Sequence, residues 1–210
     1  MTSTYDAVKR TMDIVISLLM LLFLSPVLVF FSLAIWLHDK HSPLFIDTRI
    51  GKDRKKFRLF KFRSMVIDAD EIMLKNVEIY KQMRSGVNKM KDDPRVTKVG
   101  KFIRKYSIDE LPQVINVLRG DMSIIGPRAL RPDEFKLYEK KHHGNVSKLD
   151  ILTSIKPGIT GYWQVSGRSN VDFEKRMDMD CEYAKKKSIL FDILILLKTP
   201  FAVIKGEGAY

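Results

Sequence analysis

Residues 14–37 read IVISLLMLLFLSPVLVFFSLAIWL, and this stretch determines how the rest of the chain is organised. It holds 24 residues without a charged side chain, and only three serines and Pro26 interrupt the apolar residues. A helix of roughly 20 residues can cross the hydrocarbon core of a bilayer. The stretch therefore predicts a membrane anchor at residues 1–40, with a helix over about residues 12–37. A cleaved secretory signal is disfavoured, because charged residues follow at 39–40 where small residues would prepare a cleavage site.

Ser25 and Pro26 interrupt the helix near the middle of the stretch. Proline removes one backbone N–H and its ring clashes with the preceding turn, and a nearby serine hydroxyl can bond a carbonyl group freed in this way. Two geometries remain open: a kinked spanning helix, and a re-entrant helix that returns to the face it entered. Residues 49–63 carry eight Lys and Arg against one acid, and Lys9 and Arg10 precede the stretch. Because Lys and Arg favour the cytoplasmic side, charge on both flanks favours re-entry.

The whole chain has 210 residues and a net charge of +12, from 37 Lys and Arg against 25 Asp and Glu. The charges before Ile14 cancel, so the excess belongs to the part of the chain after the apolar stretch. A single cysteine, Cys181, excludes an intrachain disulfide framework and fits a reducing compartment. Such a charge indicates an anionic partner, which is a nucleic acid, a membrane surface or a phosphorylated substrate.

Residues 41–210 have the pattern of one small α+β domain. Residues 44–50 and 56–63 predict a β-hairpin with its turn at residues 51–54. Helices are expected over residues 66–84 and 98–105, and residues 189–197 predict a helix that lies in the core or on the membrane interface.

The stretch Ser107-Ile108-Asp109-Glu110-Leu111-Pro112-Gln113 has two interpretations. Ser107 and Glu110 have the spacing of a capping box, and residues 111, 114, 115 and 118 would form the apolar face of the helix that follows. In the functional interpretation, the basic residues at 101, 104 and 105 bring a phosphate beside adjacent acids. One carboxylate would then attack phosphorus and the other would hold a divalent cation.

Residues 120–128, GDMSIIGPR, predict a short apolar strand that Gly126-Pro127 ends. Arg128 follows directly on this rigid turn. An arginine held in this way can clamp a phosphate through two parallel hydrogen bonds. Arg168, after Gly167, has two interpretations, as a nucleotide-phosphate contact or as a solvated loop residue.

Four motifs in order resemble one family, the bacterial monotopic sugar-1-phosphate transferases that act on polyprenyl phosphate. They are residues 61–65 (KFRSM), 107–113, 120–128, and 157–168 with PGITG and GR at its ends. The resemblance extends from the apolar stretch to the C-terminus. It implies transfer of a sugar-1-phosphate from a nucleoside-diphosphate sugar, usually a UDP-sugar, to undecaprenyl phosphate at the cytoplasmic face of the bacterial inner membrane. The implied reaction is the first membrane step of exopolysaccharide, capsule, O-antigen or glycoprotein glycan synthesis.

The resemblance also implies roles for individual residues. Asp109 would be the nucleophile that becomes a phosphosugar-aspartyl intermediate with loss of UMP, and Glu110 the ligand of Mg²⁺, with Mn²⁺ as an alternative. Lys61, Arg104 and Arg128 fall on basic positions near the phosphates, and Asp180 on an important acid. Ser25-Pro26 matches the break in the family's re-entrant helix. Ala129 replaces the second proline of the family's Pro-Arg-Pro motif, so the turn that carries Arg128 is expected to be less rigid.

Two other classes of protein account for part of the pattern. A membrane-anchored nucleic-acid binder would use the net charge and the aromatic and basic residues of 57–63. A scaffold for anionic lipids would use the anchor and the basic residues after it. Neither explains the paired acids, so we expect a UDP-sugar, undecaprenyl phosphate and membrane lipids as partners and no nucleic acid, with a homodimer left open.

Overall fold

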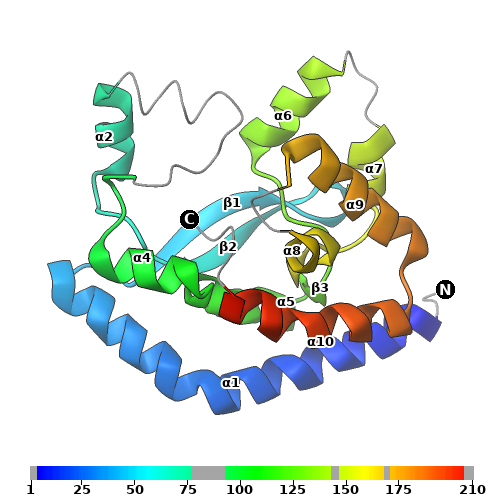
Figure 1. Cartoon of the computed structure of the whole chain (residues 1–210), viewed down its shortest axis with the longest axis horizontal. Helices are drawn as coiled ribbons and strands as arrows, with labels where there is room; N and C mark the ends of the chain where they lie inside the picture. The colour runs from blue at the N-terminus through cyan, green and yellow to red at the C-terminus, as the bar shows by residue number, and fades with distance from the viewer. Residues whose placement is uncertain (1–3, 77–92, 143–146, 168–170, 206–210) are drawn as a thin grey trace.

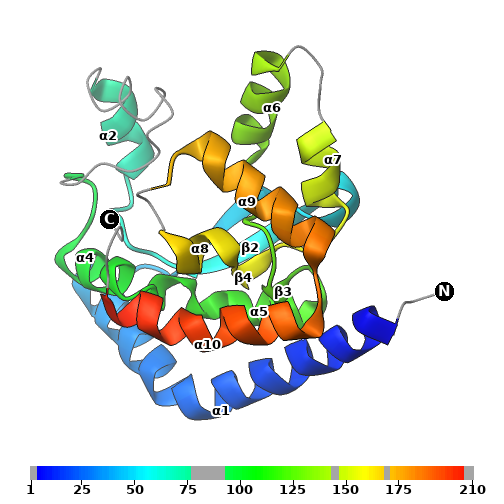
Figure 2. The ribbon, with the colours of Figure 1, turned by 45° about the vertical axis from the view of Figure 1, so that its right-hand side comes forward.

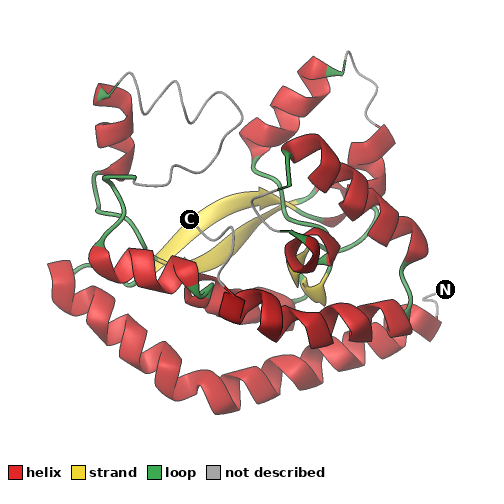
Figure 3. Cartoon of the chain, viewed as in Figure 1, coloured by secondary structure: helices red, strands yellow, loops and turns green. Residues whose placement is uncertain are grey.

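The computed structural model describes residues 4–76, 93–142, 147–167 and 171–205. The elements, in chain order, are α1 (Thr4–Asp39), β1 (Leu44–Ile50), η1 (Lys52–Arg54), β2 (Lys56–Phe62), α2 (Ala69–Lys75), α4 (Lys98–Lys105), η2 (Ile108–Gln113), α5 (Val114–Arg119), β3 (Ser123–Ile125), α6 (Pro132–Lys141), α7 (Ser147–Thr153), β4 (Gly158–Thr160), α8 (Tyr162–Ser166), α9 (Phe173–Lys186) and α10 (Ile189–Lys205). Figure 3 shows the strands at the centre with helices around them. The mixed composition of helix and strand confirms the predicted α+β class.

The apolar stretch lies within one long helix, α1, which begins at Thr4, earlier than the predicted start near residue 12. By length and composition this helix could cross a membrane, and most of its apolar side chains are exposed, with Leu22 and Phe23 at 67% and 71%. Pro26 lies inside the helix, and Ser25 Oγ donates to the Leu22 carbonyl at 3.0 Å, as expected beside a proline. Figures 1 and 2 show α1 bent near its middle, with both arms rising toward the rest of the chain.

The N-terminal arm of α1 is fixed to the domain by polar groups. Asp13 is only 4% exposed, and its Oδ1 accepts from Ser123 Oγ and from the Ile124 backbone N–H, both at 2.9 Å. Arg10 donates to the carbonyls of Val117 and Leu118 at the end of α5, at 2.6 and 2.9 Å. Lysine and arginine side chains commonly satisfy the last carbonyls of a helix. Arg10 therefore joins α1 to α5, in addition to placing a positive charge before the apolar stretch.

The predicted hairpin is confirmed. β1 and β2 pair antiparallel from Leu44 with Phe62 to Ile50 with Lys56, and η1 forms the turn between them. Asn116 of α5 holds the free edge of β2, because its Oδ1 accepts from the Phe60 N–H at 3.0 Å and its Nδ2 donates to the Arg58 carbonyl. This places η2 and α5 directly against the strand that carries Lys61.

The second sheet is a parallel pair, β3 and β4, in which Ser123 pairs with Gly158 and Ile125 with Thr160. The backbone at Gly126 approaches that at Gly158 so closely that a Cβ on either glycine would collide with the other strand. Two glycines are therefore required where the chain leaves β3 for the loop that carries Arg128. The main apolar core lies around this sheet and includes Leu59, Val117, Met122, Ile124, Ile125, Tyr183 and Ile195.

Helices α4 and α10 form the face of the domain above α1 in Figures 1 and 2. The predicted helix at 189–197 is longer than expected and runs to Lys205. It buries Ile195 at 1% exposure but leaves Leu197 and Phe201 exposed at 63% and 71%. One side of α10 therefore packs in the core, and other side chains of the same helix form an exposed apolar surface. Of the helix predicted over 66–84, α2 is described, and the part from residue 77 onward lies outside the described residues.

Candidate active site

The paired acids Asp109 and Glu110 lie on η2, a 3₁₀ segment, instead of at the start of an α-helix. The predicted capping box is wrong: Ser107 has a left-handed backbone with φ of 55°, and its side chain does not cap the segment. Pro112 explains the difference, because proline lacks an N–H and disfavours the α conformation at the residue before it. The α-helix begins only at Val114, so its buried side differs from the predicted face, with Ile115 39% exposed.

Glu110 forms an ion pair with Lys61, with Nζ and Oε1 3.1 Å apart. Lys61 comes from β2 and Glu110 from η2, and both side chains are about one-fifth exposed. The pair therefore joins two motifs that are 49 positions apart in the sequence. The structure thus brings the strand lysine into direct contact with one of the paired acids.

Arg104 approaches the same acids from α4. Its Nε donates to Ser64 Oγ at 2.8 Å. Burial lowers the pKa of the guanidinium, and the negative charge of Asp109 opposes this shift. The role of Ser64 in holding Arg104 was not predicted, because its only signal in the sequence is its place in the KFRSM motif. Gly100 allows the contact between α4 and the Ser64 backbone, because a Cβ there would collide with the Ser64 carbonyl.

A pocket connects this group to the arginine loop. Lys61, Glu110 and Arg128 all line this pocket. Its remaining lining residues are Arg49, Leu59, Gln113, Met122, Ala129, Gly158, Ile159 and Gln164. The structure thus brings Lys61, Glu110 and Arg128 to one pocket, with Arg104 and Asp109 beside it.

The loop that carries Arg128 is held by hydrogen bonds in place of the missing proline. The backbone N–H of Arg128 donates to Asp180 Oδ2 at 3.0 Å, and the Ala129 carbonyl accepts from Arg49 Nη1 at 3.0 Å. The next residue, Leu130, forms a bridge with Ile50 at the end of β1. The expected loss of rigidity at Ala129 is therefore offset by bonds from two other elements, α9 and β1.

Asp180 lies on α9 and is 2% exposed. Burial raises the pKa of its carboxyl to about 7, while the Arg128 N–H and the nearby guanidinium groups of Arg176 and Arg128 act in the opposite direction. Asp180 thus holds the Arg128 loop in place through the hydrogen bond from the Arg128 N–H. Arg168, the remaining predicted phosphate contact, lies outside the described residues.

The carboxylates that could bind a cation are Asp109 and Glu110. Within the described ranges, no group of three or more His, Cys, Asp and Glu could hold a metal ion. This donor set fits Mg²⁺, which is commonly bound by one or two carboxylates together with substrate phosphates and water. It does not resemble a closed structural metal site.

A long exposed apolar helix, adjacent acids with two neighbouring cations, and an arginine on a rigid loop are typical of proteins that handle phosphate groups at a membrane. The profile of the family described as "Bacterial sugar transferase" matches residues 4–206. The chain belongs to this family.

Several curated proteins are similar to nearly the whole chain. The undecaprenyl-phosphate galactose phosphotransferase of Salmonella typhimurium is 41% identical over 205 residues, covering 96% of this chain and 41% of that protein. The UDP-glucose:undecaprenyl-phosphate glucose-1-phosphate transferase of Escherichia coli is 39% identical over 208 residues, with the same coverage. The exopolysaccharide production protein ExoY of Sinorhizobium fredii is 37% identical over 206 residues, covering 96% of this chain and 88% of that protein. The chain thus spans about two-fifths of the length of the longer relatives, which is 41% for the Salmonella protein. It spans most of the length of ExoY, at 88%.

The carboxyl of Asp180 gives a pH dependence whose sign follows from its burial. Its pKa is raised from 3.8 to about 7, so the folded protein retains this proton where the unfolded chain has lost it. The stability contribution of the group is complete below about pH 4 and is lost as the pH rises toward about 7. Asp180→Asn keeps an acceptor for the Arg128 N–H and cannot ionise. We expect the melting temperature of the unmodified protein to fall more between about pH 5 and about pH 8 than that of Asp180→Asn.

Thermal unfolding in detergent, at several pH values, measures this difference. Asp180→Ala is the matched comparison, since it removes the acceptor and should melt lower at both pH values. An equal fall for the unmodified protein and Asp180→Asn would contradict the prediction.

Proposed function

We propose that this chain transfers a sugar-1-phosphate from a UDP-sugar to undecaprenyl phosphate, giving undecaprenyl-diphosphate-sugar and UMP. Family membership and the names of the Salmonella and Escherichia relatives support the reaction and both substrates. The observation that carries the proposal is the pairing of Glu110 with Lys61 in a pocket that Arg128 also lines, next to Asp109 in the chain. The name of ExoY supports exopolysaccharide production as the process served.

Asp109 serves as the nucleophile in this proposal. One of its carboxylate oxygens bonds to the sugar-bearing phosphorus, the bond from that phosphorus to the bridging oxygen breaks, and UMP leaves with the electron pair. An oxygen of undecaprenyl phosphate then bonds to the same phosphorus, and the Asp109 oxygen leaves as a carboxylate. Dividing the transfer into two displacements of this kind is the general advantage of covalent catalysis.

The neighbouring side chains hold the reactants and compensate charge. Lys61 and Arg104 place positive charge beside the acids, which reduces the repulsion between a carboxylate and the incoming diphosphate. Glu110 would hold Mg²⁺, which supplies charge neutralisation on the diphosphate when bound. Arg128, which lines the same pocket, binds a phosphate oxygen.

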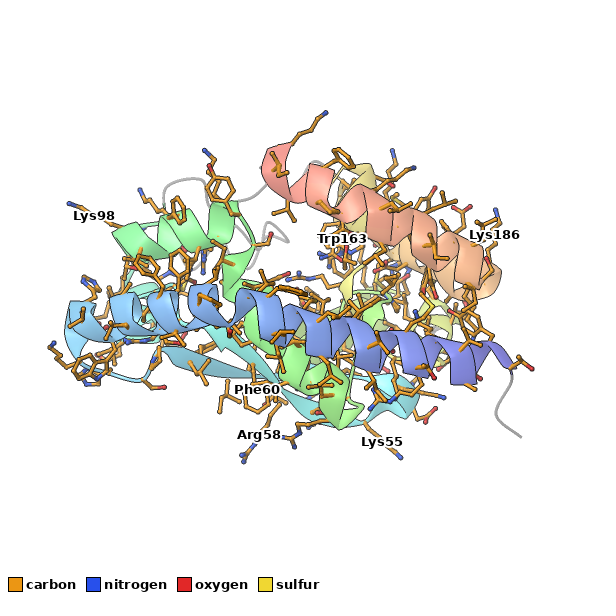
Figure 4. All side chains as sticks on the ribbon, turned by 90° about the horizontal axis from the view of Figure 1, so that it is seen from below. Lys55, Arg58, Phe60, Lys98, Trp163 and Lys186 are labelled. Atoms are coloured by element: carbon orange, nitrogen blue, oxygen red, sulfur yellow. The ribbon has the colours of Figure 1, made fainter. Side chains whose placement is uncertain are left out.

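The anchor and the basic surface support a location on the cytoplasmic face of the inner membrane. α1 enters and leaves on one face in this proposal, with its bend at Ser25-Pro26. Arg63 binds both carboxylate oxygens of Asp39 at 2.6 and 2.7 Å, which ties the C-terminal end of α1 to the strand that carries Lys61. Figure 4 shows Lys55 and Arg58 projecting from the hairpin away from the body of the domain. The pocket then lies close to the depth of lipid phosphate groups.

Replacing Asp109 with Asn should abolish transfer, because an amide cannot form the phosphosugar ester. The assay uses the full chain in lipid nanodiscs with undecaprenyl phosphate and a panel of UDP-sugars, and detects UMP release and label retained on the protein from a sugar-labelled donor. Asp133→Asn, at an exposed position on α6, is the matched control and should retain activity. A fully active Asp109→Asn would remove the nucleophile assignment, and no UMP with any donor would overturn the proposed function.

Chelation of divalent cations should stop the reaction. We expect excess EDTA to reduce UMP release to background and added Mg²⁺ to restore it, since the described acids provide only part of a coordination shell. Mn²⁺ is tested in the same restoration step. Undiminished turnover in excess EDTA would remove the metal from the scheme.

The re-entrant anchor predicts that both chain ends lie on the cytoplasmic side. A protease-cleavable tag at Met1 and the same tag at Tyr210, in separate proteins, are compared in spheroplasts and in lysed cells. Both tags should be protected in spheroplasts and cleaved after lysis. Cleavage of the Met1 tag alone in spheroplasts would establish a spanning helix.

A further inference from the structure

Three side chains from different elements meet on one side of the Arg128 loop. Trp163 lies on α8, Arg176 on α9, and Arg128 between β3 and α6. The guanidinium carbons of Arg128 and Arg176 lie 5.9 and 5.3 Å from the centre of the Trp163 ring. Phe173, also on α9, contacts Arg176 as well, with the guanidinium carbon 4.7 Å from the centre of the Phe173 ring. Figure 4 shows Trp163 within the body of the molecule, which agrees with its exposure of 6%.

The N–H groups of this cluster are buried without hydrogen-bond partners. They are Nε of Arg128, Nε and Nη2 of Arg176, and Nε1 of Trp163, none of which has a partner among the described residues. An unsatisfied buried donor is costly, and more so on a charged group. Four such donors on three adjacent side chains indicate that an acceptor is bound there when the protein works.

Arg49 is an arginine of the same structure whose guanidinium donors are satisfied by other groups of the protein. Arg49 is 4% exposed, and its Nε and Nη2 donate to Asp47 Oδ2 at 3.0 and 2.6 Å while Nη1 donates to the Ala129 carbonyl. Arg128 and Arg176 have no comparable carboxylate ion pair among the described residues; Asp180 accepts from the backbone of Arg128 and not from its guanidinium. Glu134 and Asp180 attract these two guanidinium groups electrostatically, but neither carboxylate forms a hydrogen bond with them among the described residues. The buried N–H donors of Arg128 and Arg176 are therefore left for a ligand.

The two arginines also repel one another. The pKa of Arg176 is lowered to about 10, first by burial and then by the nearby charge of Arg128. An anion between or beside the guanidinium groups would remove this repulsion and supply the missing acceptors. Arg128 lines the pocket that contains Lys61 and Glu110, so the anion would lie beside the candidate active site.

We propose that Arg128, Arg176 and the indole N–H of Trp163 form a binding site for a phosphate group of a substrate. The assignment of the phosphate to a substrate rests on the proposed function. Phosphate fits better than a carboxylate. Four N–H donors come from three side chains, and a phosphate offers more acceptor oxygens than the two of a carboxylate. Arg176 is a binding residue that the sequence motifs did not indicate.

The test compares the full chain with Arg176→Met and with Lys175→Met, in detergent or nanodiscs. Lys175 is the preceding residue on α9, is exposed, and loses the same charge in the control. The probes are UMP, uridine, a short-chain prenyl phosphate and inorganic phosphate, and the readouts are dissociation constants and ligand-induced shifts of the melting temperature. Arg176→Met should bind a phosphate-containing probe about tenfold to hundredfold more weakly, while Lys175→Met and the binding of uridine stay unchanged.

The probe that is affected identifies the source of the phosphate. Loss with UMP alone assigns the site to the nucleotide donor, and loss with the prenyl phosphate alone assigns it to the lipid. The ligand-free melting temperature of Arg176→Met should be unchanged or higher, because the variant removes two buried donors that have no hydrogen-bond partner. Arg176→Lys, which keeps the charge and loses the planar fork, should show an intermediate loss of binding.

Unchanged binding of all phosphate probes by Arg176→Met would overturn the proposed site, even if the unmodified protein releases UMP in the transfer assay. If the unmodified protein transfers no sugar from any UDP-sugar but Arg176→Met still loses phosphate binding, the anion site stands and the proposed function fails. A melting temperature several degrees lower in ligand-free Arg176→Met, with binding intact in Arg176→Lys, would show a structural role instead.

Discussion

The buried carboxylate of Asp13 imposes the constraint on which the arrangement of the molecule depends. A buried carboxylate must find hydrogen-bond donors, and this one finds them in Ser123 and the backbone of Ile124. These residues belong to β3, and the chain continues from β3 directly into the loop that carries Arg128. The same contact therefore fixes the depth of the apolar helix and the position of one end of the pocket. An anchor tethered only by a flexible linker would fix neither of them.

A second buried acid, Asp192, connects the other side of the domain to the same arm of α1. It accepts from Tyr183 at 2.6 Å, from Tyr5 at 3.0 Å and from Lys9 at 2.9 Å, so three helices meet at one carboxylate. Tyr183 is fully buried and belongs to the core around the parallel sheet. Because α9 carries Asp180 and Arg176 as well as Tyr183, this contact links the arginine cluster to α1 through one helix. Two acids, at opposite ends of the chain, thus orient the pocket relative to the apolar surface.

The sequence predicted those features that arise from patterns within a single segment. The apolar stretch, the hairpin with its turn at 51–54 and the helix at 98–105 each follow from local composition and spacing, and the structure has all three. The capping box at Ser107 failed although its spacing was correct, because Pro112 imposes a competing local geometry that the spacing rule ignores. The docking bond from Asp13 to Ile124 spans 111 positions, and neither residue carries a pattern that points to the other. Arg176 was not predicted for the same reason. Its role depends on Trp163 and Arg128, which are distant in the sequence, and not on its neighbours along the chain.

The net charge of +12 illustrates this limit, because it counts arginines that have different roles. Arg95 binds Asp93 through two bonds at 2.9 and 2.7 Å, and Arg63 binds Asp39 in the same way, so these cations are neutralised inside the fold. Arg128 and Arg176 are partly buried, and both lie near the Trp163 ring with unsatisfied buried donors. Burying a polar N–H group is unfavourable unless an acceptor satisfies it, so a fold that keeps these donors together gives up stability in the absence of a ligand. The positive charge that matters for function is therefore the part that the protein's own acids leave unpaired, and only the three-dimensional arrangement reveals which part that is.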